Sequence, residues 1–194
     1  MSKVKKGDYG YIKAYKTGKL LWSLAFAIMI SITVIATIIM FGDTSRVAIV
    51  FAILLSLPFA KFLISYIMSA PFNPLSEDDY RKICDGTCDS NGVCQGLYFD
   101  IAISMYEGIN FYPSMCIKNG RIYAYVIDKQ FNTNKKNYEK WIKQCIADSK
   151  YDYPITLFDN LDAYIKKVGS ISSPNDKTLL IDKFIKDKIF ESSL

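Results

Sequence analysis

The chain has 194 residues, no histidine and a formal net charge of +5 at pH 7. The lack of histidine excludes every catalytic or metal site that depends on imidazole, so acid–base chemistry would fall to carboxylates, Lys, Tyr or Cys. The positive charge is concentrated near the N-terminus, because residues 1–75 contain eight of the 24 Lys and Arg residues but only two of the 19 acidic residues.

The first elements along the chain are two long apolar runs, Leu20–Phe41 and Val47–Met68, with five residues between them. Each run has about the 20 residues that an α-helix needs to cross a bilayer core of roughly 30 Å. The first run is longer than the apolar region of a cleaved signal peptide, which has about 7–15 residues. The sequence therefore predicts a transmembrane helical hairpin over residues 20–70 that stays in the mature protein.

Residues 1–19 form a basic juxtamembrane segment, whereas the turn between the spans carries one Asp and one Arg. The positive-inside rule then predicts a multi-pass protein of the cell (plasma) membrane, with its N-terminus and its C-terminal domain both cytoplasmic. Lysines beside a span attract anionic headgroups, and a lysine inside a span can extend its side chain to them. The predicted headgroup-binding lysines are Lys3, Lys5, Lys6, Lys13, Lys16, Lys19 and Lys61.

Residues 76–194 are predicted to form a folded cytosolic domain that begins with a helix. Ser76 is a suitable N-cap, because three acidic residues follow it in the first helical turn. We expect this helix to end near Cys84. The small polar stretch Asp85–Gly96 after it is expected to be a loop.

Three strands are predicted next, over Leu97–Tyr106, Asn110–Lys118 and Arg121–Ile127, from their β-branched and aromatic residues. Asn119-Gly120 suits a type I′ turn, so the strands are expected to form an antiparallel meander. Pro113 lacks the N–H group that a strand ladder uses. This predicts an interruption or a bulge in the second strand.

Helical periodicity predicts a helix over Asn134–Ser149, and Tyr153–Phe158 is expected to be a short fourth strand. Two more helices are predicted over Asn160–Val168 and Asn175–Phe190. The predicted fold class is therefore a membrane α-helical hairpin of two transmembrane helices plus a small cytosolic α+β domain. The domain is expected to contain a three- to four-stranded, mainly antiparallel sheet.

The predicted order of helix, three strands, helix and strand is also the core order of a large nuclease superfamily. Those enzymes bind Mg²⁺ through an acidic residue on the second strand and an acidic-x-Lys triplet on the third. Arg121–Ile127 contains no carboxylate, while Asp100 lies on the first strand and Asp128 follows the third. Motifs for acyl transfer, nucleotide phosphates and dinucleotides are absent as well, so we predict that the protein is not an enzyme.

The five cysteines are Cys84, Cys88 and Cys94, in the spacing C-x3-C-x5-C, followed by Cys116 and Cys145. They lack the close pairs that are typical of zinc sites, and a four-thiolate site would need one ligand from the sheet. We expect reduced thiols in a cytosolic domain, with a disulfide only under oxidation. No cofactor and no metal are predicted, although a cysteine-dependent or metal enzyme remains a third alternative.

Basic residues gather in the stretch 118–150, and aromatic residues lie among them. Such a patch can bind a phosphate backbone while exposed rings stack on unpaired bases. The alternative is that Tyr138 and Trp141 belong to the core and that the lysines solvate a helix face or meet anionic lipid. The aromatic residues are Tyr123, Tyr125, Phe131, Tyr138 and Trp141. The predicted RNA- or anionic-partner-binding residues are Lys118, Arg121, Lys129, Lys135, Lys136, Lys140, Lys143 and Lys150.

The opening Gly10-Tyr11-Ile12-x-Ala14, the tight hairpin and the small α+β domain with its Tyr153–Leu161 element form one overall layout. This layout resembles uncharacterised bacterial two-span membrane proteins, some of them labelled O-linked GlcNAc transferase-like. The chain is too short for a nucleotide-sugar fold, so transferase activity is not expected. The layout is also similar to the membrane proteins that anchor the ornate large extremophilic (OLE) RNA, which implies a structured RNA partner.

The sequence thus predicts a non-enzymatic integral membrane scaffold, working as a homo-oligomer, whose cytosolic domain binds a macromolecule such as a structured RNA. The alternative is an accessory or sensor subunit of another membrane protein complex. In that case Lys61 and the small residues of the spans would make helix–helix contacts with the partner.

Overall fold

The structure is a computed structural model that describes residues 4–41, 46–88, 94–171 and 176–194. It divides into two compact units, one formed by Ile12–Phe72 and the other by Met1–Tyr11 together with Asn73–Leu194. The basic segment 1–19 is divided between these two units. Its first part belongs to the folded domain, and the remainder belongs to the helical hairpin.

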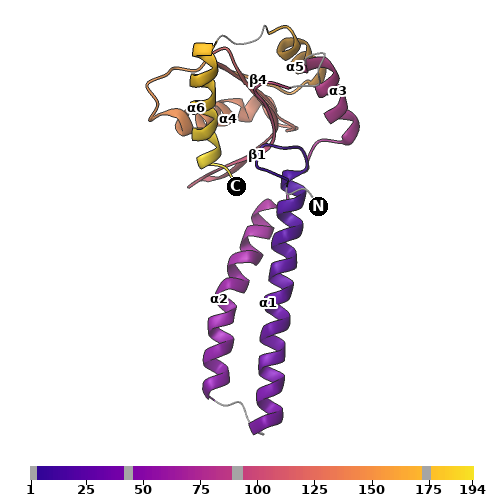
Figure 1. The fold of residues 1–194 in the computed structure, drawn as a ribbon, viewed down its shortest axis with the longest axis vertical. Helices are drawn as coiled ribbons and strands as arrows, with labels where there is room; N and C mark the ends of the chain where they lie inside the picture. The colour runs from indigo at the N-terminus through magenta and orange to yellow at the C-terminus, as the bar shows by residue number, and fades with distance from the viewer. Residues whose placement is uncertain (1–3, 42–45, 89–93, 172–175) are drawn as a thin grey trace. The chain divides into compact units, whose positions relative to one another are not determined.

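The hairpin unit contains α1, Tyr11–Phe41, and α2, Arg46–Ser69 (Figure 1). Both helices are long and apolar enough to span a membrane, and only 6% and 0% of their most apolar stretches are buried. Rings pack the two helices together, with Phe62 of α2 stacked 6.0 Å from Trp22 and 5.7 Å from Phe26. The remaining apolar surface needs surroundings that the described part of the chain does not provide.

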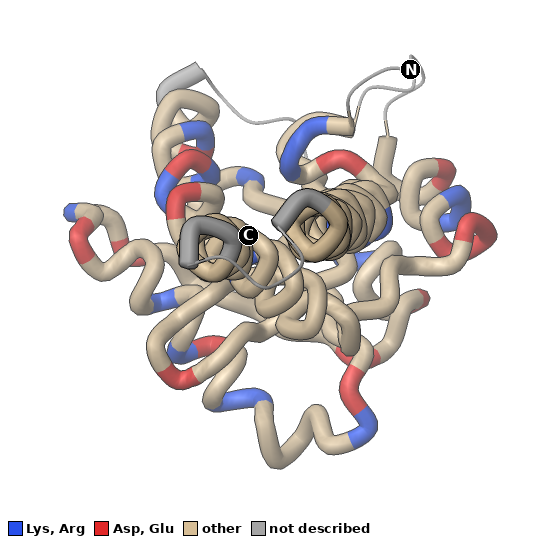
Figure 2. Tube along the Cα trace, turned by 90° about the horizontal axis from the view of Figure 1, so that it is seen from below, with Lys and Arg blue, Asp and Glu red and all other residues tan. Residues whose placement is uncertain are grey.

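The globular unit follows the predicted order of helix, three strands, helix, strand and two helices (Figure 1). Figure 2 marks Lys and Arg positions and Asp and Glu positions along the backbone trace, and the two kinds are mixed over this unit. Its elements are α3 Glu77–Thr87, β1 Leu97–Met105, β2 Gly108–Lys118, β3 Arg121–Tyr125, α4 Phe131–Ile146, β4 Ile155–Phe158, α5 Leu161–Gly169 and α6 Asp176–Glu191.

The four strands form one sheet in the order β1-β2-β3-β4. The first three are antiparallel, but β4 runs parallel to β3, with Ile122 opposite Ile155 and Tyr125 opposite Phe158. The prediction of a mainly antiparallel sheet is therefore wrong, because the sheet is mixed. The physical reason is the crossover through α4, which carries the chain back to the starting end of β3 before β4 begins.

Helices cover both faces of the sheet and create two hydrophobic cores. α4 and α6 bury one face, where Met115, Ile117 and Ile122 lie. α3 and α5 bury the other, where Cys116 and Tyr123 lie. Figure 1 shows the sheet between these two helix pairs. Neighbouring residues of β2 and β3 therefore alternate between two apolar environments, as expected for strands that are buried on both sides.

The alternation of faces changes at Asp100 on β1 and at Pro113 on β2. Phe99 lies in the core beneath α3 and α5, whereas Ile101 lies in the core beneath α4 and α6. Asp100 between them has a left-handed φ of 53°. In β2, Tyr112 and Met115 face the α4 side on either side of Pro113. The expected interruption at Pro113 is thus a change of face, because β2 itself continues to Lys118.

Both chain ends pack against β1. The amide of Phe99 donates to the Gly7 carbonyl at 2.8 Å, and the amide of Leu194 donates to the Ala102 carbonyl at 2.9 Å. Nearby, the Tyr9 ring stacks on the Tyr80 ring with centroids 4.1 Å apart. These contacts cover the backbone edge that β1 would otherwise expose to strand pairing.

A buried carboxylate fixes the turn between β2 and β3. Asp182 on α6 is 5% exposed and accepts bonds from the amides of Asn119 (2.9 Å) and Gly120 (3.1 Å). It also accepts a 2.8 Å bond from the Tyr153 hydroxyl. Asn119 and Gly120 both have positive φ, as the predicted type I′ turn requires. One side chain thereby joins the hairpin turn, α6 and the segment before β4.

We expect Asp182→Ala to lower the free energy of unfolding by about 2–4 kcal/mol, because it leaves buried donors without an acceptor. Chemical unfolding of the detergent-solubilised chain, followed by near-ultraviolet circular dichroism, measures the loss. The control is Asp187→Ala on the same helix, which removes only a surface ion pair with Lys186 (2.7 Å). It should cost less than about 1 kcal/mol. Equal losses in the two variants would contradict the anchoring role of Asp182.

Candidate functional site

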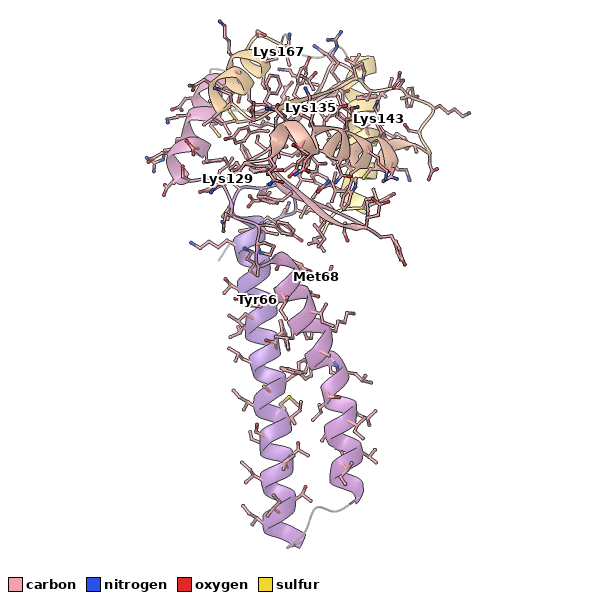
Figure 3. The ribbon with its side chains drawn as sticks, turned by 180° about the vertical axis from the view of Figure 1, so that it is seen from behind. Tyr66, Met68, Lys129, Lys135, Lys143 and Lys167 are labelled. Atoms are coloured by element: carbon pink, nitrogen blue, oxygen red, sulfur yellow. A yellow bond between two sulfur atoms is a disulfide. The ribbon has the colours of Figure 1, made fainter. Side chains whose placement is uncertain are left out.

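The strongest candidate site is the solvent-facing side of α4. One face of this helix, with Trp141, Ile142 and Cys145, is buried against the sheet. Four lysines of the same helix are exposed: Lys135, Lys136, Lys140 and Lys143. Figure 3 labels Lys135 and Lys143 on this helix. Lys136, Lys140 and Lys143 line a shallow depression of about 430 Å³ together with Glu139, and the Lys140 ammonium lies 3.2 Å from the Glu107 carboxylate. We call these four residues the α4 lysine face.

Asp128 organises the start of α4. Its carboxylate accepts bonds from the Gln130 amide (2.8 Å), the Asn134 side-chain amide (2.8 Å) and the Tyr138 hydroxyl (3.1 Å). Gln130 occupies the N-cap position but makes no side-chain cap bond. The bond from Asn134, followed by that from Gln130, holds the pKa of Asp128 below its usual value. Asp128 therefore ties the first two turns of α4 to the residues that precede the helix.

The other predicted anion-binding residues lie on different elements. Lys129 and Lys150 are exposed on either side of α4, and Arg121 is exposed at the start of β3. Lys118 differs, because it is only 8% exposed and its ammonium donates to the Ile171 carbonyl at 3.2 Å. Lys118 is thus a partly structural residue rather than a member of an open surface.

The aromatic residues of this region do not form an exposed stacking surface. Tyr123, Phe131 and Trp141 are 4%, 6% and 3% exposed. The Tyr138 ring packs edge-on against Tyr112, and its hydroxyl is bonded to Asp128. The alternative in which Trp141 belongs to the core is confirmed. Base stacking on these rings is therefore not available to a partner.

Several lysines predicted to bind headgroups have partners within their own unit. In the globular unit, Lys6 donates to the Phe190 and Ser193 carbonyls at 2.9 and 2.6 Å, and burial lowers its pKa. In the hairpin unit, Lys16 donates to the Ala70 and Phe72 carbonyls.

The remaining predicted headgroup lysines vary in exposure. The Lys19 ammonium lies over the Tyr15 and Phe62 rings. Lys5, Lys13 and Lys61 are exposed, and Lys3 lies outside the described residues. Headgroup binding by the exposed three stays a prediction.

The globular unit also contains a pocket of about 290 Å³ that the sequence pattern does not reveal, lined in part by Lys118, Lys183 and Lys186. Tyr98 also lines it, and burial raises the pKa of Tyr98 to about 12. Lys183 and Lys186 are three residues apart on α6, which is the only sequence signal for the pocket. The Asp182 carboxylate lines it too, and the Lys118 ammonium already donates to the Ile171 carbonyl, so this pocket offers fewer available cations than the α4 lysine face.

The cysteines depart from the expected reduced state. Cys88 and Cys94 form a disulfide, and the Cys84 sulfur lies within 4.8 Å of both of their sulfurs. Cys116 and Cys145 are buried elsewhere, and burial raises the pKa of the Cys116 thiol to about 12. The structure thus brings three cysteines together and leaves the other two as unreactive core residues.

The positions that would carry nuclease chemistry have no carboxylate. β2 and β3, which are fully described, contain no Asp or Glu. Ser114 lies opposite Tyr125 in the sheet, and its hydroxyl is bonded to that of Tyr164 at 2.9 Å. The order of elements resembles the nuclease core, but the residues that would bind Mg²⁺ on these two strands are absent.

Comparisons with protein-family models, with curated proteins and with solved structures find no match to this chain.

We expect Asp128→Asn to destabilise the chain at pH 7 by up to about 1 kcal/mol, as for the loss of a helix cap. Because the folded-state pKa of Asp128 is lowered, its contribution is present above its ordinary pKa and is lost as pH falls through the lowered value. The stability difference between wild type and variant should therefore shrink between pH 7 and pH 3 in urea unfolding. Asp148→Asn, beyond the other end of α4, is the control. A difference for Asp128→Asn that does not change with pH would contradict the capping role.

Proposed function

We propose that this protein is a non-enzymatic membrane anchor whose globular domain binds a polyanionic partner, a structured RNA, through the α4 lysine face. The observation that carries the proposal is the division of α4 into a buried apolar side and an exposed side with four lysines. Rows of cations on a rigid helix suit the regular phosphates of a nucleic-acid duplex. Asp128 fixes the start of this helix, so its lysines are presented at defined positions.

The burial of the aromatic rings supports one form of RNA recognition over another. Single-stranded RNA is bound largely by stacking on exposed rings, whereas duplex RNA is bound through its shape, phosphates and 2′-hydroxyls. Tyr123, Phe131 and Trp141 are buried, so stacking on them is not available. We therefore propose that the lysines contact the phosphate backbone of a folded RNA, and we expect the binding affinity to fall steeply as the salt concentration rises.

We also propose that α1 and α2 span the plasma membrane and that the globular domain lies in the cytoplasm. The low burial of both helices supports insertion into lipid. Residues on both sides of the hairpin belong to one globular unit, which supports a hairpin with both ends on the same side of the bilayer. The lysines that precede α1 favour the cytoplasmic side. The exposed apolar surfaces of α1 and α2 also suit homo-oligomerisation within the membrane.

Crosslinking in cells, followed by purification of the full chain in detergent and RNA sequencing, tests the RNA proposal. We expect one enriched RNA, with recovery falling about tenfold or more in the double variant Lys136→Glu/Lys143→Glu. The magnitude of the slope of log affinity against log salt should fall by about one for each lysine removed.

The matched control is Lys166→Glu/Lys167→Glu, which makes the same change of charge at exposed positions of α5. Figure 3 labels Lys167 on that helix, apart from the lysines of α4. The control should retain most RNA recovery. Equal losses in both double variants, or no enriched RNA in the wild type, would contradict binding through the α4 lysine face.

An apolar depression supports the second candidate, an accessory subunit of another membrane protein complex. It measures about 450 Å³ and is lined in part by Tyr151, Leu180 and Phe184. These side chains are 46%, 72% and 44% exposed, which is unusual for large apolar groups on one surface. Enrichment of one membrane protein instead of RNA in the same crosslinking experiment would favour this candidate.

Thiol labelling of intact cells tests the membrane orientation. Cys116 is buried and is not a useful reporter, whereas Tyr106 is fully exposed between β1 and β2. We expect a membrane-impermeant maleimide to leave Tyr106→Cys unmodified in intact cells and to label it after permeabilisation. The unsubstituted chain provides the background. Labelling of Tyr106→Cys from outside would contradict the cytoplasmic location.

A further inference from the structure

Three cysteine side chains converge at the end of α3 and the start of β1. Cys84 lies on α3, Cys88 is the C-cap of that helix, and Cys94 lies three residues before β1. Their sulfur atoms all lie within 4.8 Å of one another, and all three side chains are half-buried. The closeness of Cys84 and Cys88 follows from their i, i+4 spacing on a helix and does not depend on the disulfide.

Close backbone packing fixes the α3 side of this cluster. A β-carbon at Gly86 would overlap Ile165 of α5, and a β-carbon at Gly169 would overlap the Gly86 carbonyl oxygen. Only glycine at these positions lets α3 and α5 approach so closely. The last turn of α3, which carries Cys84 and Cys88, is therefore held in place by its contact with α5.

A second close approach fixes the position of Cys94. Gly96 has a φ of 74°, and its carbonyl accepts a 2.8 Å bond from the Ile117 amide. A β-carbon at residue 96 would overlap the Ile117 carbonyl oxygen. The chain around Cys94 is thus tied to β2 by contacts that do not involve the disulfide. Both sides of the cluster are thus held by backbone contacts other than the sulfur–sulfur bond.

The distances suit metal coordination. A thiolate–metal bond is about 2.3 Å long, so the sulfurs of a three-thiolate site lie about 4 Å apart. All three sulfurs lie within 4.8 Å of one another, and those of Cys88 and Cys94 are bonded, so these two must move apart on reduction to reach this spacing. A cation here also lies near the C-terminal end of α3, where the helix dipole favours positive charge.

We propose that Cys84, Cys88 and Cys94 form a three-thiolate site for a thiophilic d10 metal ion, copper(I) or zinc(II), and that the Cys88–Cys94 disulfide is its oxidised, metal-free form. Thiolates select these ions, and the chain has no histidine to offer a harder ligand. Copper(I) can be three-coordinate with thiolate ligands alone, whereas zinc(II) needs a water molecule as its fourth ligand. The site is independent of RNA binding.

The two forms are related by a balanced reaction. A dithiol reductant transfers two electrons and two protons to the Cys88–Cys94 disulfide, which becomes two thiols, and the reductant becomes a disulfide. Metal binding then displaces the protons of the three thiols into solvent and forms three sulfur–metal bonds. A reducing cytoplasm keeps the site available to metal, and oxidation closes it.

The test uses the full chain in detergent, reduced with dithiothreitol, desalted without oxygen and offered either zinc(II) or copper(I) alone. We expect one equivalent of metal by elemental analysis. The preferred metal is the one that stays bound to the protein in competition with the stronger chelator. Iodoacetamide labelling followed by mass spectrometry should show protection of all three cysteines when metal is bound. The oxidised chain should bind metal only after reduction.

The decisive variant is Cys84→Ser, which leaves the disulfide-forming pair in place. We expect its metal affinity to fall at least about 10–100-fold, the loss that even an outer-shell change causes. Cys145→Ala, at a buried position on α4, should keep the wild-type affinity. The proposal is overturned if the reduced wild type binds neither ion, or if Cys84→Ser binds metal as tightly as the wild type. Protection of the wild-type cysteines gives a second measure that does not depend on how the variant folds.

Discussion

Burial of both faces of a four-stranded sheet is the constraint on which the globular domain depends. α4 and α6 cover one face, and α3 and α5 cover the other. Each helix packs its apolar side against the sheet, so only its polar side is accessible to a binding partner. For α4 this leaves the lysine face exposed. For α3 the same requirement brings its last turn against α5 and places Cys84 and Cys88 beside the chain that enters β1.

The sheet adapts to this constraint at one irregular point. Asp100 and Pro113 mark the position where β1 and β2 exchange their faces, and Asp100 takes up the backbone distortion. Beyond that point, both ends of the chain pack along β1. The N-terminal segment is thereby part of the domain, and Lys6 bonds carbonyl groups near the C-terminus. Exposed lysines on α4 and a group of three cysteines at the end of α3 then lie on opposite sides of the sheet.

Much of the fold follows from local sequence. The apolar runs predict two long helices, Ser76 begins α3, and Asn119-Gly120 forms the tight turn with positive φ at both residues. These features depend on residues that are close in the chain, where propensity and hydrogen bonding act directly. The periodicity of α4 likewise separates its apolar stripe from its lysines without reference to the rest of the protein.

Tertiary contacts decide what local pattern cannot. The sequence of α4 does not say that the chain returns to the starting end of β3, so the parallel pairing of β4 was not predicted. Lys118 and Lys6 look like free cations until distant carbonyls accept their bonds. The meeting of Cys84, Cys88 and Cys94 depends on glycine contacts with α5 and β2.

Sequence by itself determined the membrane-length hairpin, the order of elements and the lysine face, because these depend on periodicity and charge. Only the tertiary structure decided strand direction, side-chain burial and the thiol cluster, because these depend on contacts between residues far apart in the chain.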